Sequence, residues 1–275
     1  MHSLLFFLLS TFGAQDPESL IDDARIKRSL TRALAAAEKN PKYQSLDSML
    51  KESATGNGDV ETIEQSTETY SSDELYQKLQ KSALIVAIQY KCNRCTRKHL
   101  RTASAFAIAP DVIATNHHVV EKGGFAAVVV DFEGKGHPFR EILHTDEGAD
   151  LAILRVGGEP LTPLPLSRSL PATGESVYVL SHPAQHFWVF TQGSVSRVTH
   201  RKGKGVEVNV TAPYARGSSG APIVDKHGNV VAVVKSTQSI YSEPHSSGKA
   251  PEGQLQMVIR QTVPGRKIRT LLGSK

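Results

Sequence analysis

The chain has 275 residues, of which 39% are apolar, and it carries 32 lysines and arginines against 27 acidic side chains. This length allows one medium domain with extensions or two small domains, and the composition is typical of a globular protein. No apolar run approaches the roughly 18 residues of a membrane-spanning helix, so we expect no membrane span in the mature chain.

The first 14 residues have the pattern of an export signal. An apolar run, Leu4–Leu9, is followed by the small residues Gly13 and Ala14, which offer a cleavage site before polar Gln15. The preceding Met-His-Ser has no lysine or arginine, which leaves a buried N-terminal strand or helix as the alternative. We predict a signal peptide over residues 1–14 and export to the periplasm or the cell exterior.

Charge is distributed unevenly along the chain. Residues 15–75 carry 13 acidic and 7 basic side chains, whereas residues 76–275 carry 14 acidic and 25 basic ones. A basic surface can attract nucleic acid, but here the lysines and arginines are dispersed and no aromatic pattern for base stacking accompanies them. We therefore expect a solvated basic surface, onto which the acidic segment can fold, and no nucleic-acid partner.

Residues 15–75 read as a helical and linker segment. Asp16 and Pro17 predict the start of a helix over 17–39. Its apolar residues recur at helical spacing: Ile26, Leu30, Leu34 and Ala37. The polar, Gly/Ser/Thr-rich residues 52–70 predict a linker. A short helix then restarts in "SSDELYQKLQK", with Ser71 and Glu74 in capping-box spacing.

From Ala83 onward, short β-rich runs alternate with turn signals, which indicates an all-β sandwich or barrel. The predicted strands are 83–90, 103–109, 112–115, 125–132, 138–143, 151–156, 176–181, 187–198, 205–211, 222–224, 229–236 and 255–262. The stretch "TVPGRKIRTLLG" predicts a closing helix capped by Gly273. Only two residues follow Gly273, so we expect no further domain in this chain.

Two cysteines, Cys92 and Cys95, occur in "KCNRCTRKH". In an exported protein they can close a small disulfide loop, which is our prediction, with free thiols as the alternative. A c-type haem requires histidine directly after the second cysteine, where this chain has Thr96. A zinc site would need a fourth ligand beyond Cys92, Cys95 and His99, so we expect no metal.

Three segments carry residues for chemistry: "TNHHVV" (115–120), "DLAIL" (150–154) and "RGSSGAP" (216–222). Each alone has an ordinary structural explanation. Together they supply a serine nucleophile, an imidazole base and a carboxylate to orient that base. The glycines beside the two serines allow a close backbone approach, which an oxyanion hole built from amide groups requires.

The order His…Asp…Ser on an all-β chain resembles the chymotrypsin-fold, trypsin-like serine peptidases. Three segments are similar in sequence to the HtrA/Deg branch of these peptidases: "ASAFAIAPDVIATNHHVV", "VYVLSHP…FTQGSVSRV" and "LQMVIRQTVPGRKIRTLL". The resemblance covers about residues 83–272. It implies two six-stranded antiparallel β-barrels with a short C-terminal helix, in a peptidase domain over 76–275 without a PDZ domain.

The resemblance also implies which residue fills each catalytic role. The base stands directly before Val-Val, which selects His118 and makes His117 a neighbour. The nucleophile stands directly before the second glycine, which selects Ser219. Asp150 is the implied orienting carboxylate, with Asp146 as its nearest rival, and the amides of Gly217 and Ser219 are the implied oxyanion donors.

The same alignment implies the substrate-contacting residues. They are Pro213, Tyr214, Ala215, Lys235, Ser236 and Thr237. No aspartate aligns with the pocket floor, so a trypsin-like preference for Arg or Lys lacks support, and we expect a small or medium apolar side chain before the scissile bond. Ala105 and Ala221 replace glycines usual in the branch, and Ser218 stands where relatives have Asp or Asn.

The expected function is therefore a serine endopeptidase that needs no cofactor and acts on a protein or peptide. The alternative is a non-catalytic or latent binding module on a protease fold. The segment 15–75 could cover the cleft or mediate homo-oligomerisation.

Overall fold

The computed structural model describes residues 20–52, 60–92, 94–201, 205–242 and 253–273. The signal predicted over 1–14 and the helix start predicted at Asp16 and Pro17 lie outside these ranges. Within them, no helix is both long and apolar enough to cross a membrane.

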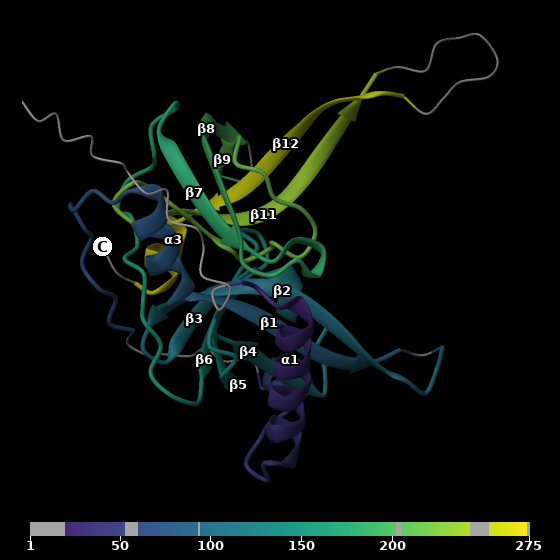
Figure 1. The fold of residues 1–275 in the computed structure, drawn as a ribbon. Coiled ribbons are helices and arrows are strands. Elements are labelled where there is room, and N and C mark those ends of the chain that lie inside the picture. Colours follow the sequence, from purple (N-terminus) through teal and green to yellow (C-terminus); the bar gives the residue numbers. More distant parts are fainter. Residues whose placement is uncertain (1–19, 53–59, 93, 202–204, 243–252, 274–275) are drawn as a thin grey trace, which may run out of the picture.

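Two closed, six-stranded antiparallel barrels form the body of the protein (Figure 1). The first barrel contains β1 (Ala83–Lys91), β2 (Lys98–Ala109), β3 (Val112–Thr115), β4 (Ala126–Val130), β5 (Gly136–Asp146) and β6 (Leu151–Val156). The second contains β7 (Ser176–Ser181), β8 (Val189–Arg201), β9 (Gly205–Val210), β10 (Pro222–Val224), β11 (Val230–Tyr241) and β12 (Leu255–Pro264). The predicted fold class is confirmed, and all twelve predicted strands are present.

The barrels close in equivalent orders, β1-β2-β3-β6-β5-β4 and β10-β11-β12-β9-β8-β7. Strand β1 is apolar from Ala83 to Ile88 because both of its faces are buried there. Leu84, Val86 and Ile88 point into the core of the first barrel, while Ile85 and Ala87 join a second core shared with the other barrel and the N-terminal helices. Because successive side chains of a strand point to opposite faces, a strand covered on both faces loses the apolar–polar alternation.

Three helices precede the barrels: α1 (Asp23–Lys39), α2 (Leu46–Lys51) and α3 (Ser72–Gln80). Helix α1 begins later than expected, because the Asp22 side chain caps it by accepting from the Arg25 amide at 2.9 Å. Its buried Leu30 and Leu34 pack on the first barrel, beside β4 and β5. Helix α3 has the predicted capping box, in which the Ser71 amide and hydroxyl both donate to Glu74 at 2.7 Å.

Residues 60–70, within the predicted linker, form no helix or strand but are tied to the second barrel. The Asn229 side chain bonds the Ser66 backbone twice, accepting from its amide at 2.8 Å and donating to its carbonyl at 3.0 Å. The Tyr70 amide donates to the Lys226 carbonyl. The described part of the N-terminal segment is therefore packed on the barrels along its length.

The shorter helical elements are α4 (His117–Val120), a 3-10 turn (Pro183–Gln185) and the closing helix α5 (Arg266–Leu271). Gly273 follows α5 with a φ of +70°, the left-handed conformation expected of a C-terminal cap. Two antiparallel ribbons extend beyond the barrels, the β1–β2 hairpin and the β11–β12 arm (Figure 1).

Candidate active site

A cleft of about 500 Å³ lies where the two barrels meet. The first barrel contributes His118 and Asp150. The second contributes the remaining lining residues, which are Tyr214, Ala215, Arg216, Ser219, Val234, Lys235, Ser236 and Thr237. No described residue of 20–80 lines this cleft, so the helices α1–α3 leave it uncovered.

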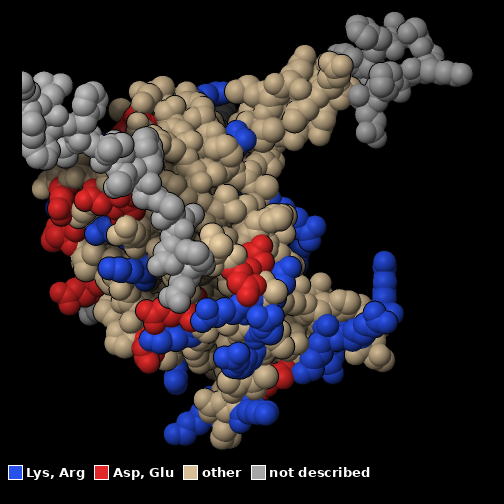
Figure 2. Space-filling model, in the orientation of Figure 1, with Lys and Arg blue, Asp and Glu red and all other residues tan. Residues whose placement is uncertain are grey.

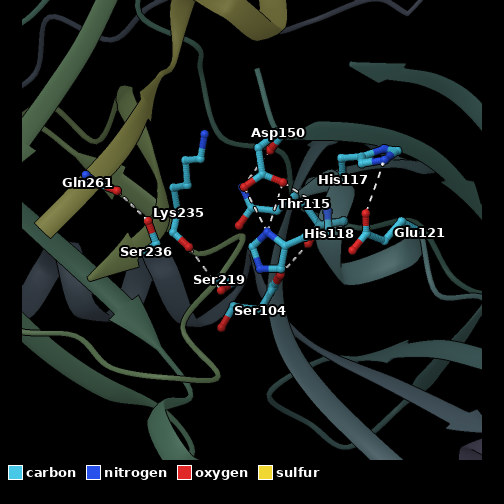
Figure 3. Close-up of polar contacts among 11 residues, drawn as sticks. Ser104, Thr115, His117, His118, Glu121, Asp150, Ser219, Lys235, Ser236 and Gln261 are labelled. Carbon is cyan, nitrogen blue, oxygen red and sulfur yellow. Dashed lines mark hydrogen bonds and ion pairs between the residues drawn. The ribbon is translucent and has the colours of Figure 1, made fainter. Parts of the chain in front are cut away.

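His118 is held by Asp150 through three contacts. The carboxylate accepts from the His118 amide at 3.0 Å and lies 2.9 and 3.0 Å from the ring Nδ1. Because an ionised carboxylate can only accept, the contact selects the tautomer with the proton on Nδ1, and in the neutral ring of this tautomer Nε2 has the lone pair. Figure 3 shows the imidazole between Asp150 and Ser219.

Asp150 adopts an unusual backbone conformation, with a φ of +59°. Asp and Asn populate this left-handed region more readily than other side chains. The buried Asn116, directly before α4, donates from its amide to the Asp150 carbonyl at 2.9 Å. The strained turn is thus fixed from the same segment that carries His118.

His117 points away from the cleft, toward Glu121 (Figure 3). Its Nε2 lies 3.7 Å from the Glu121 carboxylate. The helical turn of α4 therefore separates the two neighbouring imidazoles, and only His118 reaches Asp150.

Ser219 lies in the loop between β9 and β10, with Gly217 and Gly220 at φ values of +100° and +86°. Its hydroxyl donates to the Lys235 carbonyl at 3.3 Å, which leaves rotation about Cα–Cβ as the movement that would direct it to His118. Catalytic hydrogen bonds are often long before substrate binds. Within the described chain, the amides of Gly217 and Ser219 donate to no protein acceptor.

Ser104 of β2, which sequence reasoning did not identify, ties this loop to the first barrel. Its amide donates to the Ser219 carbonyl at 2.9 Å and its hydroxyl to the Gly217 carbonyl at 3.0 Å. The Thr115 hydroxyl in turn donates to the Ser104 carbonyl at 2.8 Å. A serine inside the apolar run "ASAFAIA" is the signal that could have indicated such a role, because a polar side chain in a strand of that kind needs a hydrogen-bond partner.

Two buried polar side chains lie behind the Ser219 loop. The Ser218 hydroxyl donates to the Ser181 hydroxyl at 3.0 Å, so this position holds a neutral pair. His182 accepts from the Trp188 amide through Nδ1 at 3.1 Å. Burial lowers the pKa of His182 to about 3, which keeps its ring neutral at physiological pH.

Five of the six predicted substrate-contacting residues line the cleft, namely Tyr214, Ala215, Lys235, Ser236 and Thr237. Pro213 is outside the lining, and its carbonyl accepts from the Thr191 hydroxyl at 2.8 Å. The buried Tyr214 hydroxyl donates to the Gln261 carbonyl at 2.8 Å and lies 3.3 Å from that of Ser236. Burial raises the pKa of Tyr214, so its phenol stays protonated.

Cys92 and Cys95 lie outside the cleft lining, in the turn between β1 and β2 at the tip of that hairpin. Both are free thiols in the structure, with their sulfurs 3.2 Å apart. The predicted disulfide therefore stays a prediction.

Comparison with known proteins agrees with this geometry. Residues 103–233 match the family model for the trypsin-like peptidase domain. A serine protease from Mycobacterium tuberculosis is 29% identical over 161 residues, which cover 54% of this chain and 39% of that protein. The "Protease Do-like 5, chloroplastic" of Arabidopsis thaliana is 28% identical over 170 residues, 55% of this chain and 52% of the relative.

A third relative is the "Probable periplasmic serine endoprotease DegP-like" of Hahella chejuensis, 29% identical over 141 residues, or 48% of this chain and 29% of that protein. The chain thus spans between about a third and about half of the length of these curated relatives. The family match begins within β2 and ends within β11, so it includes His118, Asp150 and Ser219 but not β1 or β12. The chain therefore resembles the trypsin-like serine peptidases and their HtrA/Deg branch, in agreement with its two closed six-stranded barrels.

Proposed function

We propose that the protein is a serine endopeptidase, with Ser219 as nucleophile, His118 as general base and Asp150 as the group that orients and stabilises the imidazole. The observation that carries the proposal is the contact of His118 Nδ1 with the Asp150 carboxylate at 2.9 Å, which leaves Nε2 facing Ser219. A serine hydroxyl needs such a base because it is a weak nucleophile when protonated.

In the proposed reaction, His118 Nε2 takes the hydroxyl proton as Ser219 Oγ bonds to the substrate carbonyl carbon. The amides of Gly217 and Ser219 stabilise the resulting oxyanion. His118 then gives the proton to the leaving amine, the peptide C–N bond breaks, and an acyl-enzyme forms. Water repeats the sequence, which releases the acid and regenerates Ser219.

Strand β11 is the proposed binding edge for the substrate backbone. Ser236 is paired with Gln261 of β12, and its carbonyl lies near the Tyr214 hydroxyl. Its main-chain groups therefore point into the second barrel and not toward the cleft. Because alternate residues of a strand direct their main-chain groups to opposite sides, the groups of Lys235 and Thr237 are the ones left for an extended peptide.

The cleft favours a small or medium apolar side chain before the scissile bond. The Tyr214 ring is 7% exposed and fixed by the carbonyl of Gln261, so it fills space that a long side chain would occupy. Asp150 is the only carboxylate among the described lining residues, and it is engaged by His118. A basic substrate side chain therefore has no free acidic partner in the described cleft.

Active-site labelling tests the proposal. Wild-type protein should react with a fluorophosphonate probe and Ser219→Ala should not, while Ser218→Ala serves as a matched control because its hydroxyl is turned to Ser181. The alternative is a latent or non-catalytic module. It is supported by the hydrogen bond that the Ser219 hydroxyl donates to the Lys235 carbonyl and not to His118. Absence of labelling in wild-type protein, with or without peptide substrate, would favour that alternative.

Export and self-association complete the proposal. We propose that residues 1–14 direct export, in line with the name of the Hahella chejuensis relative, a probable periplasmic serine endoprotease. Homo-oligomerisation through residues 15–75 stays a prediction. In the described part of that segment, Leu30, Leu34, Leu75 and Leu79 are buried within the chain itself.

A further inference from the structure

Three metal-binding side chains meet at the tip of the β1–β2 hairpin, outside the proposed catalytic cleft. The sulfurs of Cys92 and Cys95 are 3.2 Å apart, and the Cys95 sulfur lies 2.9 Å from His99 Nε2. All three donor atoms lie within 4.8 Å of one another. The hairpin carries them well beyond the first barrel (Figure 1).

The strand register brings the three side chains together. Tyr90 of β1 is paired with His99 of β2, so their side chains share one face of the hairpin. Cys92 follows Tyr90 by two residues, which directs it to the same face. The Tyr90 ring stacks on His99 with centroids 5.4 Å apart, and the Arg101 guanidinium lies 5.2 Å from the Tyr90 centroid. The imidazole is thus held in orientation by a layer of packed side chains.

We propose that Cys92, Cys95 and His99 form a three-ligand site for a thiophilic divalent cation, with zinc as the ion that fits best. Two thiolates and one imidazole are ligands that zinc takes in proteins, and a fourth position can hold water. Bond lengths of about 2.3 Å to sulfur and about 2.0 Å to nitrogen require donor separations of about 3.5–3.8 Å in a tetrahedron. The Cys92–Cys95 and Cys95–His99 contacts, now 3.2 and 2.9 Å, would each have to open by about 0.6 Å. The Cys95 side chain is exposed enough to move.

Charge around the tip is compatible with this ion. Four exposed cationic residues lie close to the ligands in the sequence, namely Lys91, Arg94, Arg97 and Lys98, of which Lys98 is paired with Glu38 at 2.8 Å. Figure 2 shows Lys and Arg gathered over the hairpin. Positive surroundings favour thiolate over thiol. Two thiolates neutralise a divalent cation, so the loaded site adds no net charge to a basic surface.

This site differs from the predicted disulfide in a measurable way. A disulfide would consume both thiolates and leave His99 without a role, whereas a metal site needs Cys92 and Cys95 as reduced thiolates and His99 as a neutral imidazole. Metal affinity tests this site, and it does not depend on whether Ser219 is a nucleophile.

The test is a cobalt titration of the full chain, made metal-free under reducing conditions and carrying no polyhistidine tag. One equivalent of Co²⁺ should produce a thiolate-to-cobalt charge-transfer band, and added Zn²⁺ should displace it. Cys95→Ser should abolish the band, and His99→Gln should weaken affinity at least about tenfold. His200→Gln, an exposed histidine outside the cluster, is the matched control and should leave affinity unchanged.

Two results would overturn the site. One is a reduced wild-type protein that binds no more Co²⁺ than the Cys92→Ser/Cys95→Ser double variant, while its oxidised form contains the Cys92–Cys95 disulfide. The other is a band unaffected by His99→Gln, which would show that the histidine is not a ligand. Circular dichroism on each variant checks that the exposed tip was altered without loss of the barrels.

Discussion

The amide of Ser104 in the first barrel donates a 2.9 Å hydrogen bond to the carbonyl of Ser219 in the second. The Ser104 hydroxyl adds a bond to the Gly217 carbonyl, and Thr115 links Ser104 to the segment that leads into His118. The position of the proposed nucleophile relative to the proposed base is therefore set by hydrogen bonds of Ser104 and Thr115, one of which crosses the barrel interface from the Ser104 main chain and one from its hydroxyl.

Ser104→Ala removes the hydroxyl bond and leaves the Gly217 carbonyl unpaired. We expect the free energy of unfolding to fall by about 1–2 kcal/mol. We expect kcat to fall about tenfold with little change in KM, because the loop that carries the proposed oxyanion donors loses one of its hydrogen bonds.

The control for this variant is Ser82→Ala. Ser82 is equally buried, but its hydroxyl has no partner among the described residues. Its removal should leave stability and kcat unchanged or slightly raise stability. Denaturant unfolding and peptide-hydrolysis kinetics measure both variants, and equal losses in the two would contradict a positioning role for Ser104.

Gly217→Ala should inactivate the enzyme while the barrels remain folded. A Cβ at this position would lie 2.6 Å from the His182 carbonyl oxygen, and the φ of +100° already disfavours a side chain. The loop must shift, and with it the amides of Gly217 and Ser219. Fluorophosphonate labelling and thermal unfolding report the two effects separately.

Gly174→Ala provides the matched comparison, since Gly174 has a φ of +91° but no atom within 4 Å of its added Cβ. It should cost about 1–2 kcal/mol of stability through backbone strain alone and leave labelling intact. Normal labelling of Gly217→Ala would mean that the loop tolerates displacement.

His182 should make stability depend on pH. Burial lowers its folded-state pKa to about 3 from an ordinary 6.5. The unfolded chain therefore binds more protons between these values, and the stabilising contribution present above pH 6.5 is lost as pH falls toward 3. The slope from this residue is at most about 1.4 kcal/mol per pH unit.

His182→Gln, which can still accept from the Trp188 amide, should flatten that slope, whereas His200→Gln should not. Urea unfolding between pH 7 and pH 4 measures the difference between the variants. Identical slopes in wild type and His182→Gln would assign the acid sensitivity to other groups.

Tyr214→Ala should broaden the cleavage preference toward larger apolar side chains. The buried ring leaves the cleft and exposes space beside Ser236 and Gln261. Cleavage of a peptide library by wild-type and variant protein checks this, with Tyr214→Phe retaining the wild-type preference. An unchanged profile in Tyr214→Ala would place the specificity pocket elsewhere.

The sequence was sufficient to predict the strands, because short β-rich runs alternate with turn residues along residues 83–262. It was weaker where side-chain contacts decide the structure. Helix α2 has six residues, too few to be stable alone, and it is held by buried Leu46 and Met49 and by the Asp47 carboxylate, which accepts from the Gly124 amide. Such contacts join residues more than 70 positions apart and leave no local pattern.

The residues of the candidate site likewise fall into those that the sequence could predict and those that it could not. Asp150, His118 and Ser219 stand in short motifs, so they could be selected before their proximity was known. Ser104 and Asn116 act through hydrogen bonds that arise only when the barrels are assembled. The contribution of His99 beside Cys95 depends on the register of β1 and β2, which the spacing of the cysteines alone does not determine.

The most direct test of the proposed catalytic centre is to compare peptide hydrolysis by His118→Ala and His117→Asn. The two histidines are adjacent in the chain, but only His118 contacts Asp150, while His117 faces Glu121. We predict a loss in kcat of about 10⁴-fold or more for His118→Ala and activity within a few fold of wild type for His117→Asn. Activity retained by folded His118→Ala, or an equal loss in both variants, would contradict the assignment of His118 as the base.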